Sequence, residues 1–432
     1  MRLNMGSFKI KNIKFGTNTA LDGATLIINK DELIAEILAE EKVIKNVDIE
    51  LTHPGENCRI IHVMDAVEPR VKIEGGDSTY PGIKTPVYRC GGGTTYRMDG
   101  VAVITTSLLP LRKAGGLYIA REGILDLAGP NSGHTPFSKT SNVVVNISVD
   151  PNYTEEEYEV AIRNAGILAA RYLAQALVDK QPDYFTEYSI SEKKPGLKNV
   201  VYINQIESCG LFGRNYLYGM PYDFLLPTLI HPNEFLDGAL VNSLHSHTAV
   251  QIPTYYQTNN PVIEGLFKRH GKTLNFLGVI LLRAQFEEID GKHRCANLVA
   301  GMAQLLGADG VVATWECAGN SFVETMFYLK ACENMGIKTV LITYENEITE
   351  KAEDALFYFE PEVDAIVSTG VLQAPITYPK VDRVIGGDEF RFHPERGGVL
   401  LPADQELERD GRLESWCACN NVGLTNLSLD DF

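Results

Sequence analysis

The second half of the chain alternates between short apolar runs and helix-like segments. The apolar runs are 276–282 (FLGVILL), 310–315 (GVVATW) and 338–344 (KTVLITY), and the helical patterns between them are 297–307 (NLVAGMAQLLG) and 321–336 (SFVETMFYLKACENMG). Two later runs, DAIVST and RVIGG, continue the series. Alternation of this kind is typical of βαβ units. The pattern therefore predicts a parallel sheet.

The first half of the chain is rich in strand-like patterns. Residues 8–15 (FKIKNIKF) alternate like a strand, and residues 31–40 (DELIAEILAE) have the pattern of a short helix. A longer helix is predicted after Thr154, because Glu157 follows three residues later and apolar residues recur as far as Leu177.

Together these patterns define the expected fold class, α/β. We predict a strand-rich, mixed α+β N-terminal half, residues 1–241, and a C-terminal parallel-sheet βαβ domain, residues 242–432. At 432 residues, the chain is long enough for each part to have its own core.

Composition narrows the classes of partner. The chain has 39 Lys and Arg against 56 Asp and Glu, a formal net charge of −17. This charge argues against nucleic acid and anionic membrane, because both bind surfaces with an excess of Lys and Arg. No segment has the pattern of a signal peptide or of a membrane span, so we expect a cytoplasmic protein.

Neither the cysteines nor the glycines form a known cofactor motif. The eight Cys residues are scattered, and Cys417 and Cys419 lack the CxxC spacing of thioredoxin-like proteins. Residues 90–95 (CGGGTT) lack the GxGxxG spacing of a dinucleotide site and indicate a tight turn. No nucleotide cofactor is expected.

One candidate site lies after the strand predicted at 310–315. Ligands of parallel sheets bind beyond the carboxyl ends of the strands, where Glu316, Cys317 and Asn320 precede a helix. Glu345 follows the next strand and is expected to join Glu316. The alternative is that Asn320 or Ser321 caps the helix and that Glu316 faces solvent.

The loop 242–247 (NSLHSH) is a second candidate site. Ser243 and Ser246 are nucleophiles that directly follow a carbonyl, so the bonds Asn242–Ser243 and His245–Ser246 are candidates for self-cleavage to a pyruvoyl group, with a neighbouring His as base. The carbonyl of the pyruvoyl group would bind a substrate amine and accept electrons. The alternative is an ordinary, uncleaved loop.

The same loop permits a metal site. His245 and His247 lie two residues apart and share one face of an extended segment, which suits one metal ion. The sequence does not single out a third ligand among His231, Glu234, Asp237, His270 and Cys209. Two histidines that line a polar pocket are the alternative.

Several other groups are candidates for binding substrate. His134 and Lys139 lie in a long irregular loop that also contains Arg121 and Glu122. Tyr255, next to Tyr256, can form an aromatic wall for a methylated amine, with core packing as the alternative. We expect a structural ion network from Glu68, Arg70 and Glu74.

Long phrases of the chain resemble one known family, the alpha–beta proprotein subunit of component B of the glycine/sarcosine/betaine reductases, which is related to the D-proline reductase proprotein. The resemblance covers about residues 48–387. The phrases that carry it are 59–76 (RIIHVMDAVEPRVKIEGG), 118–145, 231–277 (beginning HPNEFLDGALVNSLHSH), 336–343 (GIKTVLIT) and VDRVIGG from Val381.

The resemblance implies an activity, and this sequence differs from the family at the position that is central to it. Family members form a pyruvoyl group from a Cys in the 231–277 region, whereas this chain has no Cys there and has His245 at the matching position. The family's glutamate-then-glycine-asparagine loop corresponds to Glu316 and Asn320. A selenocysteine- or cysteine-containing partner subunit is implied, with oligomeric assembly.

Three functions follow from these observations. The first is a substrate-activating subunit, inactive alone, for reductive C–N cleavage of a small amino acid or N-methylated amine in anaerobic metabolism. The second is a metal-dependent hydrolase or lyase that uses His245 and His247 on an amino-acid-like substrate. The third is a non-catalytic scaffold subunit.

Overall fold

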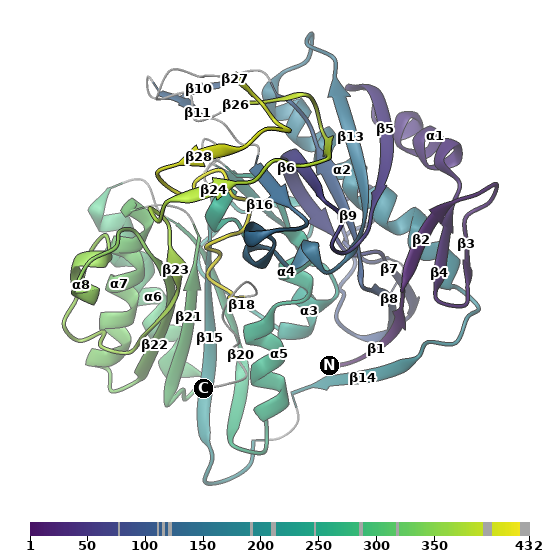
Figure 1. The fold of residues 1–432 in the computed structure, drawn as a ribbon. Helices are drawn as coiled ribbons and strands as arrows, with labels where there is room; N and C mark the ends of the chain where they lie inside the picture. Colours follow the sequence, from purple (N-terminus) through teal and green to yellow (C-terminus); the bar gives the residue numbers. More distant parts are fainter. Residues whose placement is uncertain are drawn as a thin grey trace.

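The fold is described from a computed structural model (Figure 1). It describes residues 1–76, 78–109, 112–114, 117–119, 123–190, 193–208, 213–245, 248–284, 288–316, 319–391 and 400–423, without the side chains of 112–114, 117–119, 244, 245 and 352. No described helix is long and apolar enough to cross a membrane.

The predicted parallel sheet is present, in the order β18-β20-β15-β21-β22-β23. Its strands are β15 (Lys198–Ile206), β18 (Thr228–Ile230), β20 (Leu274–Arg283), β21 (Gly310–Trp315), β22 (Lys338–Glu345) and β23 (Ile366–Val371). Only β18 is antiparallel to its neighbour. The mixed α/β fold class predicted from the sequence is confirmed.

Helices cover both faces of this sheet. One face packs on α6 (Ile289–Leu305) and α7 (Gly319–Asn334), and the other packs on α5 (Pro261–Arg269), as Figure 1 shows. Alternate residues of β20 serve the two faces, since Ile280 packs in the α6–α7 cluster and Val279 in the α5 cluster. A strand buried on both faces explains its continuous apolar run.

Two observations concern which strands belong to this sheet. The RVIGG run does not extend it, because β25 (Arg383–Ile385) pairs in parallel with β6 in another sheet, and that expectation is wrong. The sheet also contains β15 and β18, which precede residue 242. The division of the chain at residues 241 and 242 stays a prediction.

Three larger sheets lie in the described part of the N-terminal half. The six-stranded one has the order β12-β6-β9-β13-β5, with β25 beside β6; the others have the orders β14-β1-β8-β7 and β2-β4-β3. Their strands are β1 (Arg2–Lys9), β2 (Asn12–Phe15), β3 (Ala20–Asp22), β4 (Thr25–Ile28), β5 (Ile44–Thr52), β6 (Cys58–Val67), β7 (Arg70–Glu74), β8 (Gly93–Asp99), β9 (Val101–Thr106), β12 (Gly123–Asp126), β13 (Ser141–Val149) and β14 (Tyr184–Ser189). The strand predicted at 8–15 is in fact two, β1 and β2, because the chain changes sheets at Ile10 and Lys11.

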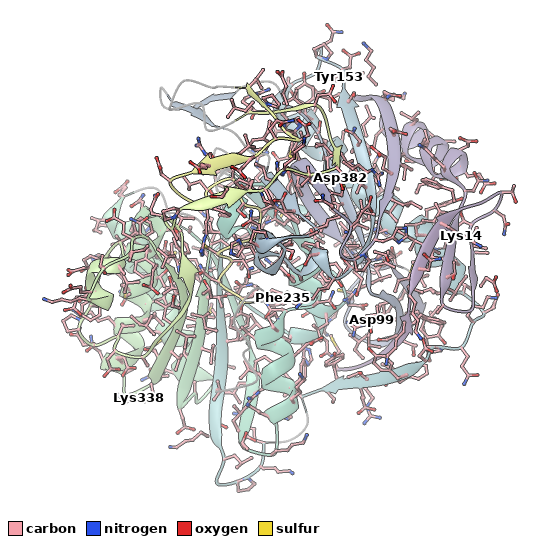
Figure 2. The ribbon with its side chains drawn as sticks, viewed as in Figure 1. Lys14, Asp99, Tyr153, Phe235, Lys338 and Asp382 are labelled. Carbon is pink, nitrogen blue, oxygen red and sulfur yellow. The ribbon has the colours of Figure 1, made fainter. Side chains whose placement is uncertain are left out.

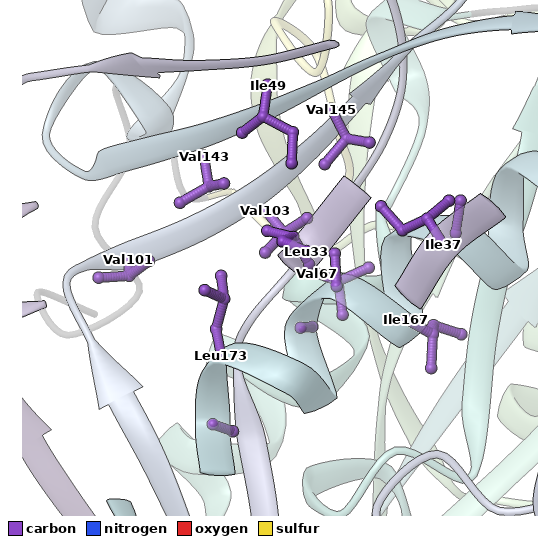
Figure 3. Packing of buried hydrophobic residues seen from close by; sticks show 14 of the residues in the cluster. Leu33, Ile37, Ile49, Val67, Val101, Val103, Val143, Val145, Ile167 and Leu173 are labelled. Carbon is purple, nitrogen blue, oxygen red and sulfur yellow. The ribbon is translucent and has the colours of Figure 1, made fainter. Parts of the chain in front are cut away.

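Two helices close the core of this half. Asn29 caps α1 (Lys30–Glu40), and α2 (Glu155–Ala174) begins with the predicted capping box, in which Thr154 and Glu157 bond each other's backbone N–H groups. Figure 3 shows Val103 of β9 and Val145 of β13 in a cluster with Ile167 of α2. The core therefore lies between the six-stranded sheet and these helices.

Small elements connect the two halves. They are the sheet β17-β16-β19, formed by β16 (Gly213–Leu217), β17 (Met220–Pro221) and β19 (Leu240–His245); the pairs β10 (Arg112–Ala114) with β11 (Leu117–Ile119), β24 (Ile376–Tyr378) with β28 (Leu407–Arg409), and β26 (Glu389–Arg391) with β27 (Leu400–Pro402); the helices α3 (Pro232–Leu236), α4 (Thr254–Thr258) and α8 (Ala352–Ala355); and the 3-10 turns η1 (Pro130–His134), η2 (Pro136–Ser138), η3 (Gln175–Leu177) and η4 (Thr248–Val250). In Figure 2, Phe235 of α3 lies near the middle of the molecule, whereas Lys14 and Lys338 lie at its two sides.

Candidate functional site

The candidate site lies where the β16–β19 ribbon meets the carboxyl edge of the parallel sheet. β19 pairs with β16, so that Asn242 lies opposite Asn215. The chain beyond the ends of β15 and β21 contains Glu207 and Glu316, both fully buried. The ribbon thus brings Asn242 and Ser243 to the strand ends, where ligands of such sheets bind.

Glu316 holds three segments together. Its carboxylate accepts hydrogen bonds from the Ile252 backbone N–H (3.0 Å), the Glu207 backbone N–H (3.0 Å) and the Asn215 side-chain amide (3.0 Å). A buried carboxylate is stabilised by N–H donors of this kind. The alternative in which Glu316 faces solvent is wrong, and Glu316 belongs to the framework beneath the loop.

Asp65 of β6 is a second buried carboxylate at the site. It accepts hydrogen bonds from the backbone N–H (2.9 Å) and the hydroxyl (2.6 Å) of Thr254, and this hydroxyl accepts the Asn242 backbone N–H (2.9 Å). Burial raises the pKa of Asp65 to about 7; the charge of Glu316 adds to the rise, and the Thr254 hydrogen bonds oppose it. Asp65 therefore titrates near neutral pH while it fixes the strand that carries Ser243.

Gln251 connects the loop to the C-terminal segment. Its amide donates to the Asn242 side chain (2.8 Å), the Met64 carbonyl (2.9 Å) and the Ser243 carbonyl (3.3 Å), and its oxygen accepts the Trp416 indole N–H (2.8 Å). The two sides of the Asn242–Ser243 bond are therefore held by fixed partners.

The Ser243 hydroxyl differs from its neighbours. The residue is 3% exposed, yet its Oγ has no hydrogen-bond partner within 3.5 Å in the part of the chain that the structure describes. Buried hydroxyls normally have a partner, so such a group is a candidate for chemistry or for ligand binding. It faces Glu159 of α2, which receives the Tyr216 hydroxyl (3.2 Å).

Of the sequence-predicted residues, Asn242, Ser243 and Glu316 lie together at this site. Glu345 does not join them, because it bonds the Ser368 hydroxyl on the neighbouring strand β23. Asn320 is exposed, and its carbonyl accepts a bond from Lys292 (3.0 Å). The structure therefore assigns Glu345 and Asn320 contacts outside this network.

The candidates from the 130–139 loop and from α4 lie in another cluster. Tyr255 packs edge-on against Phe137 (5.2 Å between centroids), and Tyr256 is also in contact with Phe137. Lys139 is exposed, whereas burial lowers the pKa of His134, with Arg412 adding to the effect. A substrate role for His134, Lys139 and Tyr255 stays a prediction.

Some predicted residues lie outside the described part of the chain. These are Ser246, His247, Cys209, Cys317, Arg121 and Glu122, together with the side chain of His245. The metal hypothesis for His245 and His247 is therefore untested.

The described candidates for a third metal ligand have other partners. His231 and Glu234 form a capping box at the start of α3, Asp237 pairs with Lys72, and His270 accepts the Phe276 N–H (3.0 Å). Over the described ranges, no three His, Cys, Asp or Glu side chains gather in a way that could hold a metal ion.

The predicted ion network is present in part. The Arg70 guanidinium donates to buried Glu68 at 2.6 Å, and Glu74 is exposed. Asp65, Thr254, Gln251 and Asn215 were missed by the sequence analysis, because polar residues with no motif acquire their role only from long-range contacts.

Comparison with known proteins identifies the class. Residues 1–428 match the family of glycine/sarcosine/betaine reductase component B subunits. The chain is 37% identical over 423 residues to the glycine reductase complex component B subunits alpha and beta of Acetoanaerobium sticklandii, covering 96% of this chain and 95% of that protein. It is 35% identical over 392 residues to the sarcosine reductase complex component B subunit alpha of Peptoclostridium acidaminophilum, covering 89% of each.

A third relative extends the comparison to betaine. The betaine reductase complex component B subunit alpha of Peptoclostridium acidaminophilum is 30% identical over 400 residues, covering 89% of this chain and 88% of that protein. No solved structure matches. The chain therefore belongs to the glycine/sarcosine/betaine reductase component B family, and its relatives are subunits of reductase complexes.

Proposed function

We propose that this chain is the substrate-activating subunit of a cytoplasmic glycine-reductase-type complex. It binds a small amino acid or an N-methylated amine and prepares its C–N bond for reductive cleavage. The observation that carries the proposal is the Asn242–Ser243 segment, which is held by buried Glu316, Asp65 and Gln251 at the carboxyl edge of the sheet. Family membership supports the same reaction class.

The electrons for this cleavage are proposed to come from a selenocysteine- or cysteine-containing partner. The six Cys residues that the structure describes in full are buried and form no disulfide with one another. Burial raises the pKa of Cys419 to about 11 and that of Cys58 to about 12, which suppresses the reactive thiolate. This set of thiols is poorly suited to redox chemistry, so the chain is expected to be inactive alone.

The residues present fit a Ser-derived pyruvoyl group at position 243. Ser243 offers a buried hydroxyl with no hydrogen-bond partner within 3.5 Å among the described residues, directly after the Asn242 carbonyl. When present, the group would supply an electrophilic carbonyl for an amine substrate. Asn242 and Gln251 would hold its flanks, and Thr254 fixes the Asn242 amide.

Intact mass under denaturing conditions tests this chemistry. Two fragments that split before Ser243 or Ser246 would support a pyruvoyl group, provided that the C-terminal fragment carries the mass change of that group. A single species near 47.7 kDa would overturn self-cleavage. Ser243→Ala is the matched variant, because it removes the hydroxyl and little else.

Two other functions remain to be tested. Metal analysis of the purified chain tests the hydrolase or lyase that would use His245 and His247: metal bound in stoichiometric amount, and turnover without a reductant, would favour it. Substrate binding by the assembled complex without any turnover would favour a scaffold role.

A further inference from the structure

A buried, unpaired guanidinium lies on the α2 side of the ribbon. Arg163 is 8% exposed, and its Nε and Nη1 atoms have no hydrogen-bond partner in the described part of the chain. Its Nη2 atom donates to the Asn164 side chain at 3.3 Å, and the guanidinium also interacts with the Tyr216 side chain. A guanidinium stays charged at all physiological pH values, so burial without an anion is costly.

Arg163 and Ser243 face the same space. The Arg163 guanidinium lies 3.7 Å from the centroid of the Tyr216 ring on β16. Tyr216 lies opposite Val241 on β19, and Val241 packs in the core cluster that contains α2. Ser243 lies against the same helix, because its side chain interacts with the Glu159 carboxyl.

Glu159 of α2 also lies close to Arg163 and Ser243. Burial raises the pKa of the Glu159 carboxyl, and Arg214, Arg163, Tyr216 and Ser243 all lower it, so these groups surround it. Glu159 lies one helical turn before Arg163 and forms no ion pair with it within 4.0 Å among the described contacts. The Arg163 donors are thus left for a different anion.

We infer that Arg163 binds the carboxylate of a small α-amino acid at a position beside residue 243. This inference rests on the proposed function and names the substrate class of the site. Guanidinium N–H groups form paired hydrogen bonds with carboxylates. The assignment selects glycine, sarcosine and betaine, which all have a carboxylate, over simple amines.

Binding to the full chain tests the inference by isothermal titration calorimetry. The probes are glycine, sarcosine and betaine, each compared with its counterpart without a carboxylate: methylamine, dimethylamine and tetramethylammonium. The wild type is expected to prefer a carboxylated member. Arg163→Met is expected to weaken that binding by about tenfold to a hundredfold and to leave the counterpart unchanged.

Arg171 provides the matched control on the same helix. Its guanidinium donates to the backbone carbonyls of Thr79, Tyr80 and Ile83. Arg171→Met is expected to lower stability and keep the wild-type affinities. Arg163→Met is expected to cost less stability than Arg171→Met, because two of the Arg163 donor atoms have no hydrogen-bond partner among the described residues.

Three results would overturn the inference. If Arg163→Met keeps the wild-type preference for carboxylates, the inference fails and the proposed function stands. If it loses as much stability as Arg171→Met, Arg163 has a structural role. If the wild type binds none of the three carboxylated compounds, the proposed substrate class fails as well.

Discussion

At the scale of single residues, two buried carboxylates hold the segment that follows the 242–247 loop. Glu316 accepts the Ile252 backbone N–H, and Asp65 accepts both hydrogen-bond donors of Thr254. Their positions explain why the polar residues Asn242 and Ser243 can lie in the interior. Removing either charge therefore has a consequence that can be measured.

Asp65 gives the protein a pH-dependent stability. Its pKa is about 7 in the folded protein against 3.8 for the ordinary group, so between these values the folded state binds more protons than the unfolded state. Its contribution is therefore most favourable below this window and is lost as pH rises through 7, by about 4 kcal/mol in total.

Asp65→Asn imitates the neutral carboxyl and should remove this slope. We expect the variant to match the wild type near pH 4 and to exceed its stability at pH 8, as measured by urea unfolding across the range. A difference between the two proteins that stays constant with pH would contradict the assignment.

Glu316→Gln should destabilise the protein strongly. The amide places N–H groups where three N–H donors converge, so we expect a loss of about 3 kcal/mol in the free energy of unfolding. Glu345→Gln is the control, because the Ser368 hydroxyl can reverse its hydrogen bond, and it should cost under about 1 kcal/mol. Equal losses would show that the network around Glu316 has no special role.

The sequence identified some of these residues and not others. Glu316 was predicted from its place after an apolar strand, and Ser243 from its place after a carbonyl. Asp65 lies within a buried strand, and its partner Thr254 is 189 positions away. No local sequence pattern predicts such a pair, because the two residues come into contact only after folding.

At the scale of elements, the sequence predicted the helices and strands that short-range interactions determine. The capping box of α2 and the strands β20 to β23 follow from capping chemistry and apolar runs. The pairing of β25 with β6 could not be predicted, because an apolar run does not specify its partner strand. The entry of β15 into the parallel sheet was missed for the same reason.

Thr154→Ala should weaken α2 without changing the site directly. Loss of the cap is expected to lower the free energy of unfolding by about 1 kcal/mol, because the Glu157 N–H loses the hydroxyl that accepts it and the Glu157 carboxylate loses the hydroxyl donor. Thr154→Ser keeps the box and is the control. Thermal unfolding compares the two, and equal midpoints would contradict the role of the cap.

At the scale of the whole molecule, the site belongs to neither half alone. Asp65 and Glu159 come from the N-terminal sheet and helix, whereas Glu316 and the ribbon belong to the parallel-sheet side. Substrate binding should therefore depend on the packing of both halves. Reduction should depend on a further protein, since the described thiols are buried.

The most direct test of the account is the release of amine from glycine, sarcosine and betaine by the assembled complex with a dithiol as reductant. The account predicts ammonia, methylamine or trimethylamine from at least one substrate, only when both this chain and its selenocysteine- or cysteine-containing partner are present. Release by the chain alone, release without the reductant, or no release from any of the three substrates would contradict it.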